Sequence, residues 1–294
     1  ASSTLLCSKP QNEKPQKVYR IVYEMRSDEW YATQANLWKK EIEKNPQNTE
    51  AWHNYYNAVR YASFVETIDT KSKQEKLQKI IDDMGEAIPG TYVYYFLRQW
   101  NSHDDDITYA KKAYELDPDR PDTYYSFISH YMMNGEPRRA KEFYQKLYQS
   151  KDIAPWLIDY NYNVLMSTDE NTILITNGDN DTYPAEMLQF VKNIREDVTI
   201  INISMSTNQE YLDSKFQSKG IKIDTKPLKQ KAKTGDSKSK VGFSKSSYIQ
   251  SLCRELSENY PDYPIYFALT VYANNYELFK NDLYNVGLAF RYSE

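Results

Sequence analysis

The chain has 294 residues, 40% of them hydrophobic, so it is long enough for two domains with apolar cores. Its 37 basic and 41 acidic residues give a formal net charge of -4, and this near balance argues against nucleic acid as a partner. With two cysteines and three histidines, the chain lacks material for a disulfide framework, a zinc site or a histidine-based catalytic triad.

The N-terminal residues from Ala1 to Ser8 carry an apolar stretch that ends at Cys7. This resembles the end of a bacterial lipoprotein signal, which implies that Cys7 is acylated and tethers the protein to a membrane. Leu6 stands where such signals usually have a small residue, so an ordinary signal-peptide remnant remains the alternative. We expect residues 1–14 to be an export-signal remnant or tether, and the protein to be periplasmic or lipid-anchored in a bacterial cell envelope.

Residues 15–166 alternate helical patterns with proline punctuation. Two helices around a turn at Gly135 are predicted between residues 121 and 152, by Tyr124, Phe127 and Tyr131 and then by Ala140, Tyr144 and Leu147. Similar patterns start at Thr49 and Ala87, which gives steps of 38 and 34 residues up to Pro121. This spacing resembles tetratricopeptide repeats. We expect three such repeats, a fourth over residues 15–48, and a capping helix over residues 155–166.

The resemblance to tetratricopeptide repeats implies a concave face for a protein partner, formed by the first helix of each repeat. The fifth, ninth, twelfth and thirteenth positions of those helices are His53, Asn57, Arg60, Tyr61, Tyr125, Ser129, Met132 and Met133. An alternative is that this groove simply faces the second domain.

Residues 167–294 read as a three-layer α/β domain of Rossmann-like type. The apolar run 172–176, a helix with Thr182 at its N-cap and Pro184 in its first turn, and the run 198–203 form a βαβ unit. Further expected elements are a helix over 208–219, a strand over 221–223, a helix over 247–260, a strand over 264–271, a helix over 274–280 and a strand over 286–292. Residues 226–247, with seven lysines, are expected to form a solvated surface loop.

Four segments of this second domain point to a known family: 177–184, 195–204, 264–267 and 287–292. They resemble the soluble C-terminal region of bacterial membrane glycosyltransferase-like proteins related to protein O-mannosyltransferases. The resemblance spans roughly residues 170–294 and implies an accessory domain on the outer side of a cytoplasmic membrane. Sugar transfer is expected in the membrane part of that family, so the resemblance does not imply it for this chain.

The loop Asp179-Asn180-Asp181 offers hard oxygen ligands at the carboxyl end of a strand, where open α/β sheets place ligands. We expect Asp179 and Asp181 to be the metal ligands if Mg²⁺ or Ca²⁺ binds. A polar crevice would be lined by Asn177, Asp179, Asn180, Asp181, Ser206, Asn208 and Asn275. Alternatively, these side chains do no more than hold a turn and cap a helix.

Two enzymatic patterns are incomplete in this chain. An aspartyl phosphohydrolase would need a small or β-branched residue at position 183, which is Tyr, and an acidic pair after residues 265–271, where Tyr272 to Asn275 stand. The chain also has no glycine-rich nucleotide loop. The sequence therefore favours a non-catalytic adaptor or scaffold without a required cofactor. The alternative is a divalent-metal-dependent enzyme or small-ligand-binding protein that uses the Asp179–Asp181 loop.

Overall fold

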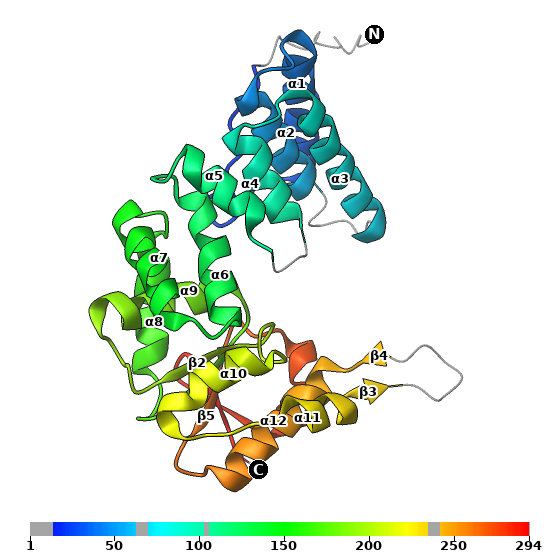
Figure 1. Ribbon diagram of the computed structural model, residues 1–294. Coiled ribbons are helices and arrows are strands. Elements are labelled where there is room, and N and C mark those ends of the chain that lie inside the picture. Colours follow the sequence, from blue (N-terminus) through cyan, green and yellow to red (C-terminus); the bar gives the residue numbers. More distant parts are fainter. Residues whose placement is uncertain (1–13, 63–69, 103–105, 235–241, 294) are drawn as a thin grey trace, which may run out of the picture. The chain divides into compact units, whose positions relative to one another are not determined.

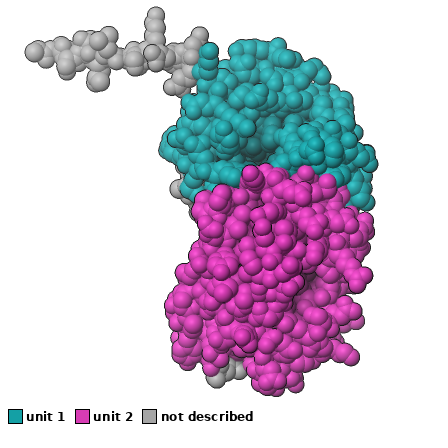
Figure 2. All heavy atoms as spheres, turned by 90° about the vertical axis from the view of Figure 1, so that its left-hand side faces the viewer, with its two compact units in different colours: residues 1–123 teal, residues 124–294 magenta. Residues whose placement is uncertain are grey.

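The computed structural model describes residues 14–62, 70–102, 106–234 and 242–293. The predicted signal remnant up to residue 13, with Cys7, lies outside the described residues. The chain divides into two compact units, unit 1 at residues 1–123 and unit 2 at residues 124–294 (Figure 2). Within the described ranges, no helix combines the length and the apolar character needed to cross a membrane.

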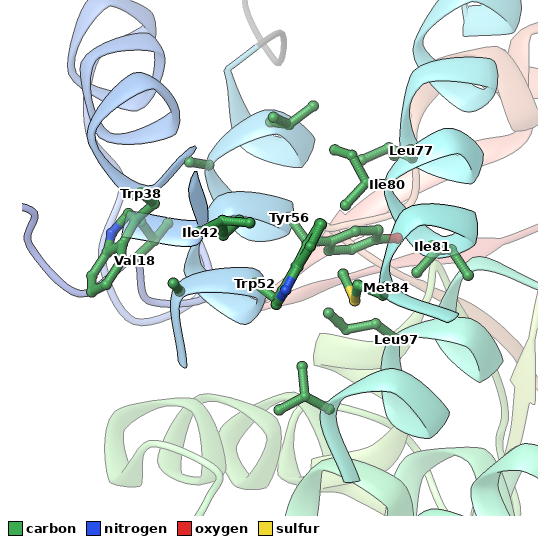
Figure 3. Packing of buried hydrophobic residues seen from close by; sticks show 14 of the residues in the cluster. Val18, Trp38, Ile42, Trp52, Tyr56, Leu77, Ile80, Ile81, Met84 and Leu97 are labelled. Atoms are coloured by element: carbon green, nitrogen blue, oxygen red, sulfur yellow. The ribbon is translucent and has the colours of Figure 1, made fainter. Parts of the chain in front are cut away.

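Unit 1 is helical (Figure 1). Its helices are α1 (Asp28–Lys44), α2 (Thr49–Tyr61), α3 (Thr70–Ala87), α4 (Tyr92–Asn101) and α5 (Thr108–Leu116), followed by the 3-10 turn Pro121–Thr123. The side chains of Ser27, Asn48 and Thr91 cap α1, α2 and α4 by accepting hydrogen bonds from the backbone of their first turns. Figure 3 shows the core between these helices, in which Trp52, Tyr56 and Met84 are buried.

The chain before α1 forms no regular helix, which corrects the helix expected at the start of the repeat over residues 15–48. Residues 14–20 are irregular and residues 21–23 make a turn. Pro15 restricts the residue before it to extended backbone, and the β-branched Val18, Ile21 and Val22 weaken helix formation further. Val18 instead enters the core of unit 1, where it is 3% exposed and belongs to the same cluster as Trp38 (Figure 3).

Unit 2 begins with three helices, α6 (Tyr124–Met133), α7 (Pro137–Ser150) and α8 (Pro155–Met166). Both α7 and α8 pack against α9 (Asp179–Lys192), which lies between the first two strands in the chain. These helices therefore share a compact unit with the sheet, and unit 2 starts at residue 124.

A mixed sheet of five strands forms the centre of the rest of unit 2. The strands β1 (Ile173–Thr176), β2 (Thr199–Asn202) and β5 (Ile265–Ala268) are parallel, with Ile173 opposite both Thr199 and Ile265. All residues of these three strands are buried, as their apolar, β-branched-rich sequences predict. The order is β2-β1-β5-β7-β6, where β6 (Leu283–Val286) and β7 (Ala289–Tyr292) are antiparallel. A hairpin thus replaces the expected closing strand, with its turn at Gly287 (φ +63°).

The segment between the second and third parallel strands differs most from expectation. Residues 221–223 form no strand, and the lysine-rich stretch contains α11 (Thr225–Lys231) and the paired strands β3 (Lys233–Thr234) and β4 (Gly242–Phe243). Asp224 caps α11 and Leu228 is buried, so apolar anchoring outweighs the lysine content. Residues 235–241 lie outside the described residues. The other helices are α10 (Gln209–Phe216) and α12 (Lys245–Asn259), with 3-10 turns at Gln217–Lys219, Ala273–Asn275 and Glu277–Asp282.

Candidate functional site

The loop after β1 is organised around the carboxylate of Asp181. Its two oxygens accept hydrogen bonds from the backbone N–H groups of Asn177 (2.6 Å) and Gly178 (2.8 Å). Because Asp181 reaches back in this way, α9 starts at Asp179 with Gly178 as its N-cap. The N-cap predicted at Thr182 was wrong. The Thr182 hydroxyl lies 2.7 Å from that of Thr176, inside the domain.

The helix α9 also contains Pro184, beyond the first turn where it was expected. A proline has no N–H, so the carbonyl of Asn180 loses the hydrogen bond that a helix would normally give it. The side-chain amide of Asn161, from α8, donates to this carbonyl at 2.9 Å. Asn161 is buried, and this bond joins α8 to the start of α9.

The strand order places the loop after β1 at the switch point of the parallel strands, between β1 and β5. Thr270, which follows β5, donates its hydroxyl hydrogen bond to the Asp181 carboxylate. The backbone N–H of Tyr272 donates to the side-chain oxygen of Asn177 at 3.3 Å. The two loops that would border a ligand crevice are therefore bonded directly to each other.

The remaining residues predicted for the crevice serve mainly local structure. The Ser206 hydroxyl donates to the carbonyl of Ile203 (2.8 Å), and Asn208 caps α10 by accepting from the N–H of Tyr211 (2.9 Å). Asn275 lies in a 3-10 turn. Asp179 and Asn180 are exposed.

Metal binding at this loop remains a prediction. Throughout the described part of the chain, no three His, Cys, Asp or Glu side chains lie close enough together to hold a metal ion. The two predicted metal ligands differ in exposure, because Asp179 is exposed and Asp181 is 3% exposed. Sequence reasoning missed Asn161 and Thr270. Pro184 was the one signal for Asn161, because a proline inside a helix leaves a carbonyl that needs a donor.

The predicted partner face on α2 is lined by the chain's own residues 14–20. The backbone N–H of Val18 donates to the side-chain oxygen of Asn54 at 2.7 Å, and the Asn57 amide donates to the Val18 carbonyl at 3.4 Å. From α1, the side-chain oxygen of Gln34 accepts from the N–H of Gln16 at 2.6 Å. The Trp38 indole donates to the carbonyl of Gln16 at 2.8 Å. The structure thus shows a segment outside any helix or strand that is bound through its backbone at alternate residues, Gln16 and Val18.

The other predicted positions on α2 differ in burial and in the residues that they contact. Tyr61 is buried, and this burial raises its pKa to about 12. The guanidinium of Arg60 lies over the ring of Trp100, 4.3 Å from its centroid. Desolvation lowers the pKa of the half-buried His53 to about 4; the negative charge of Asp122 opposes this shift, and the positive charge of Arg120 adds to it.

The predicted partner face on α6 is covered within unit 2. The hydroxyl groups of Ser129 and Tyr183 lie 2.7 Å apart, and the rings of Tyr125 and Tyr183 are in contact. Tyr125 also donates to Asp152 at 2.6 Å. Met132 is 2% exposed and Met133 is half-buried. Tyr183 comes from α9, so for this helix the structure agrees with the alternative in which the groove faces the second domain.

A buried charged cluster lies close to that contact. Glu186 of α9 is 1% exposed, and its carboxylate accepts from the Tyr144 hydroxyl of α7 and pairs with the ammonium of Lys215 from α10. Burial, followed by the charge of Glu186, raises the pKa of Tyr144 well above its usual range. The ring of Tyr144 stacks on Phe190. One carboxylate therefore joins three helices of unit 2, α7, α9 and α10.

Comparison with known proteins gives a family match that covers part of unit 2. A family model described as TMEM260-associated domain 2 matches residues 157–241. TMEM260 is an O-mannosyltransferase-like protein, so the family whose model matches is glycosyltransferase-related. The match starts inside α8 and includes β1, α9, β2 and α10. No curated protein and no solved structure matches the chain.

Proposed function

We propose that this protein is a non-catalytic adaptor or scaffold of the bacterial cell envelope, which binds a protein partner through the helices of residues 15–166. We take these helices to be tetratricopeptide repeats. The observation that carries the proposal is the surface on α1 and α2, where Gln34, Trp38, Asn54 and Asn57 hold the backbone of residues 14–20. Polar side chains that bind a backbone at alternate residues are typical of peptide recognition.

The partial family match supports the envelope location. The matched segment belongs to a domain associated with an O-mannosyltransferase-like protein. The resemblance noted in the sequence extends to residues 264–292, beyond the matched range. We propose that unit 2 provides a second recognition surface in the same system, on the outer side of the cytoplasmic membrane, with Cys7 as a lipid tether.

Partner capture from the native cell envelope tests this proposal. The bait is the whole chain with Arg60→Ala, which removes a half-buried cation from the predicted α2 face. The matched control is Glu50→Ala, an exposed charge on the same helix. We expect Arg60→Ala to recover its partner at least about threefold less well than the wild type and Glu50→Ala. Equal recovery by all three baits contradicts binding through this helix.

A second candidate function rests on Asp179 and Asn180, because both side chains are exposed at the switch point of the sheet. In this case the loop binds Mg²⁺, Ca²⁺ or a small polar ligand. Titration calorimetry with either ion, on the wild type and Asp179→Asn, tests it. Glu196→Gln, at another exposed acid of unit 2, is the control. Binding heat that Asp179→Asn alone removes supports this candidate, and the same result for all three proteins rejects it.

A further inference from the structure

We propose that the surface of α1 and α2 is a receptor for an extended peptide and that residues 14–20 are its built-in occupant. A partner segment that is extended and has a β-branched apolar residue at its centre displaces this occupant. The inference rests on the proposed adaptor function and specifies the kind of partner that unit 1 takes.

The first step of the argument is the way in which the segment is held. Four side chains bond the N–H and the C=O groups of Gln16 and Val18, and none of these bonds involves the side chains of those two residues. Backbone groups are the same in every peptide, so this surface recognises an extended chain more than a particular sequence. The partners are 18 to 39 positions apart in the sequence, so the contact is tertiary.

The second step concerns side-chain selection. Within residues 14–20, Val18 is the one buried residue, at 3% exposed, whereas Gln16, Lys17 and Tyr19 are exposed. The surface of α1 and α2 therefore selects a compact apolar side chain at the position of Val18 and tolerates other residues beside it. Val18 lies in the cluster with Trp38 and Ile42 (Figure 3).

The third step is the direction of the segment along α2. The charge of Lys17 acts on His53, near the start of α2, and the charge of Arg20 acts on Tyr61, at its end. Asn54 and Asn57 bind Val18 between these two points. Residues 14–20 thus run along α2 past three of the four partner positions predicted on this helix: His53, Asn57 and Tyr61.

The fourth step is that the built-in occupant fits imperfectly. The bond from the Asn57 amide to the Val18 carbonyl is 3.4 Å long, beyond the usual range for this type of bond. The side-chain oxygen of Asn57 is buried and has no hydrogen-bond partner among the residues that the structure describes. An occupant that donates a hydrogen bond to this oxygen would bind more favourably than residues 14–20 do.

The test uses a labelled synthetic peptide with the sequence of residues 14–20, Lys-Pro-Gln-Lys-Val-Tyr-Arg, and fluorescence anisotropy with the whole chain. In Val18→Asp, the charge cannot stay in the apolar site, so the built-in segment leaves and the peptide binds. The matched control is Tyr19→Asp, which places the same charge at the neighbouring exposed position. We expect the control and the wild type to bind the peptide at least about tenfold more weakly, because the tethered segment competes at a high effective concentration.

Two further proteins make the result specific. Val18→Asp combined with Asn54→Ala loses the acceptor for the central N–H and should bind the peptide at least about tenfold more weakly than Val18→Asp alone. A peptide with Asp in place of its Val should not bind any of the proteins. Circular dichroism and a thermal melt of Val18→Asp check that α1 to α4 remain folded.

The proposal is overturned if Val18→Asp is folded and does not bind the peptide, because the surface then has no affinity for a free segment. It is also overturned if Val18→Asp unfolds unit 1, because the segment is then a fixed part of the core. A wild-type dimer that Val18→Asp abolishes in sedimentation experiments would assign the surface to a second copy of this chain and reject the partner reading. If the peptide does not bind but envelope capture still depends on Arg60, the adaptor function stands and this inference alone falls.

Discussion

The two helices predicted to face a partner, α2 in unit 1 and α6 in unit 2, are both covered, but by different kinds of structure. On α2 the cover is an irregular segment that buries one side chain, Val18, and is held through its backbone. On α6 the cover is Tyr183 of a regular helix, backed by the buried carboxylate of Glu186. The same repeat positions were used to predict the face on α2 and on α6. These positions indicate which face of a helix is concerned, but they do not indicate what packs against it.

We infer from this difference that residues 14–20 are a removable cover of α2, whereas α9 is a permanent cover of α6. The cover on α2 gains one buried valine and four hydrogen bonds, which must offset the conformational entropy lost by an otherwise irregular segment. The cover on α6 belongs to a helix whose residues 181–188 are all buried. Removing it requires separation of α9 from α7 and α8. For this reason the proposed partner site is in unit 1 and not on α6.

The largest expected loss of stability follows substitution of Glu186 in α9, the helix that covers α6. Glu186→Ala leaves the charge of Lys215, whose side chain is 11% exposed, unpaired and Tyr144 without its acceptor. We expect a loss of about 3–5 kcal/mol in the unfolding free energy of unit 2. Hydrogen exchange of peptides from α7, α9 and α10 in increasing denaturant measures this loss. Glu142→Ala, an exposed acid of α7, is the control, and an equal effect of both substitutions would show that the cluster does not hold these helices.

A smaller effect is expected at the removable cover. Val18→Ala removes apolar contacts at a site that is 3% exposed, at a cost of about 1–2 kcal/mol. This loss should appear in the opening of residues 14–20 and, by the same amount, in the global unfolding of α1 to α4, because both transitions start from the closed state. Tryptophan fluorescence follows the global transition of unit 1 through Trp30, Trp52 and Trp100, whereas Trp38 also reports on residues 14–20 and Trp156 lies in unit 2. A loss confined to the global transition would make the two covers alike.

Tyr183→Phe tests the contact with α6 more gently. It removes the hydroxyl that lies 2.7 Å from that of Ser129 and keeps the aromatic ring against Tyr125. We expect a loss of about 1 kcal/mol in the stability of unit 2, measured by the same exchange experiment. Ser129→Ala combined with Tyr183→Phe should cost less than the sum of the two single changes, because both remove the same bond. Strict additivity would argue that the two hydroxyl groups do not interact.

The smallest expected effect is the pH dependence of unit 1. His53 has a pKa of about 4 in the folded protein and about 6.5 in an unfolded chain, so acid protonates the unfolded form first. Unit 1 should therefore lose stability as the pH falls from about 6.5 to about 4, by on the order of 1 kcal/mol after allowance for the partial exposure of His53. His53→Gln should show a flatter pH profile in fluorescence-detected denaturation. Identical profiles would show that His53 does not titrate in this way.

The sequence predicts the strands β1, β2 and β5 and helices such as α2, α6, α7 and α12, because their apolar periodicity is a local signal. The helix expected over 274–280 is instead a pair of 3-10 turns. The prediction fails at the start of α9, where Thr182 has the right residue type for a cap but Asp181 reaches back to Asn177 and Gly178. It also fails at residues 14–25, where spacing suggests a helix. Predicting this segment requires knowledge of Asn54 and Asn57, which lie 36 and 39 positions away from Val18.

For the candidate site, sequence spacing predicted that the loop Asp179–Asp181 follows a strand and that the α2 and α6 positions lie on helices. Whether these residues bind a ligand or a partner stays a prediction. Sequence spacing did not identify Thr270, which bonds Asp181 from 89 positions away, or Asn161, which serves a carbonyl that Pro184 leaves free. Such pairs depend on tertiary packing, and no local pattern of residue types specifies them.

Native-state hydrogen exchange of the Val18 amide, which donates to Asn54, shows whether residues 14–20 leave α2 without unfolding of the helices. The reference is the amide of Tyr56, inside α2. If residues 14–20 are a removable cover, Val18 exchanges at least about tenfold faster than Tyr56, at a rate that low denaturant hardly changes, because it opens without unfolding the helices. If Val18 and Tyr56 exchange with the same free energy and the same dependence on denaturant, the segment is a permanent part of unit 1 and the account is contradicted.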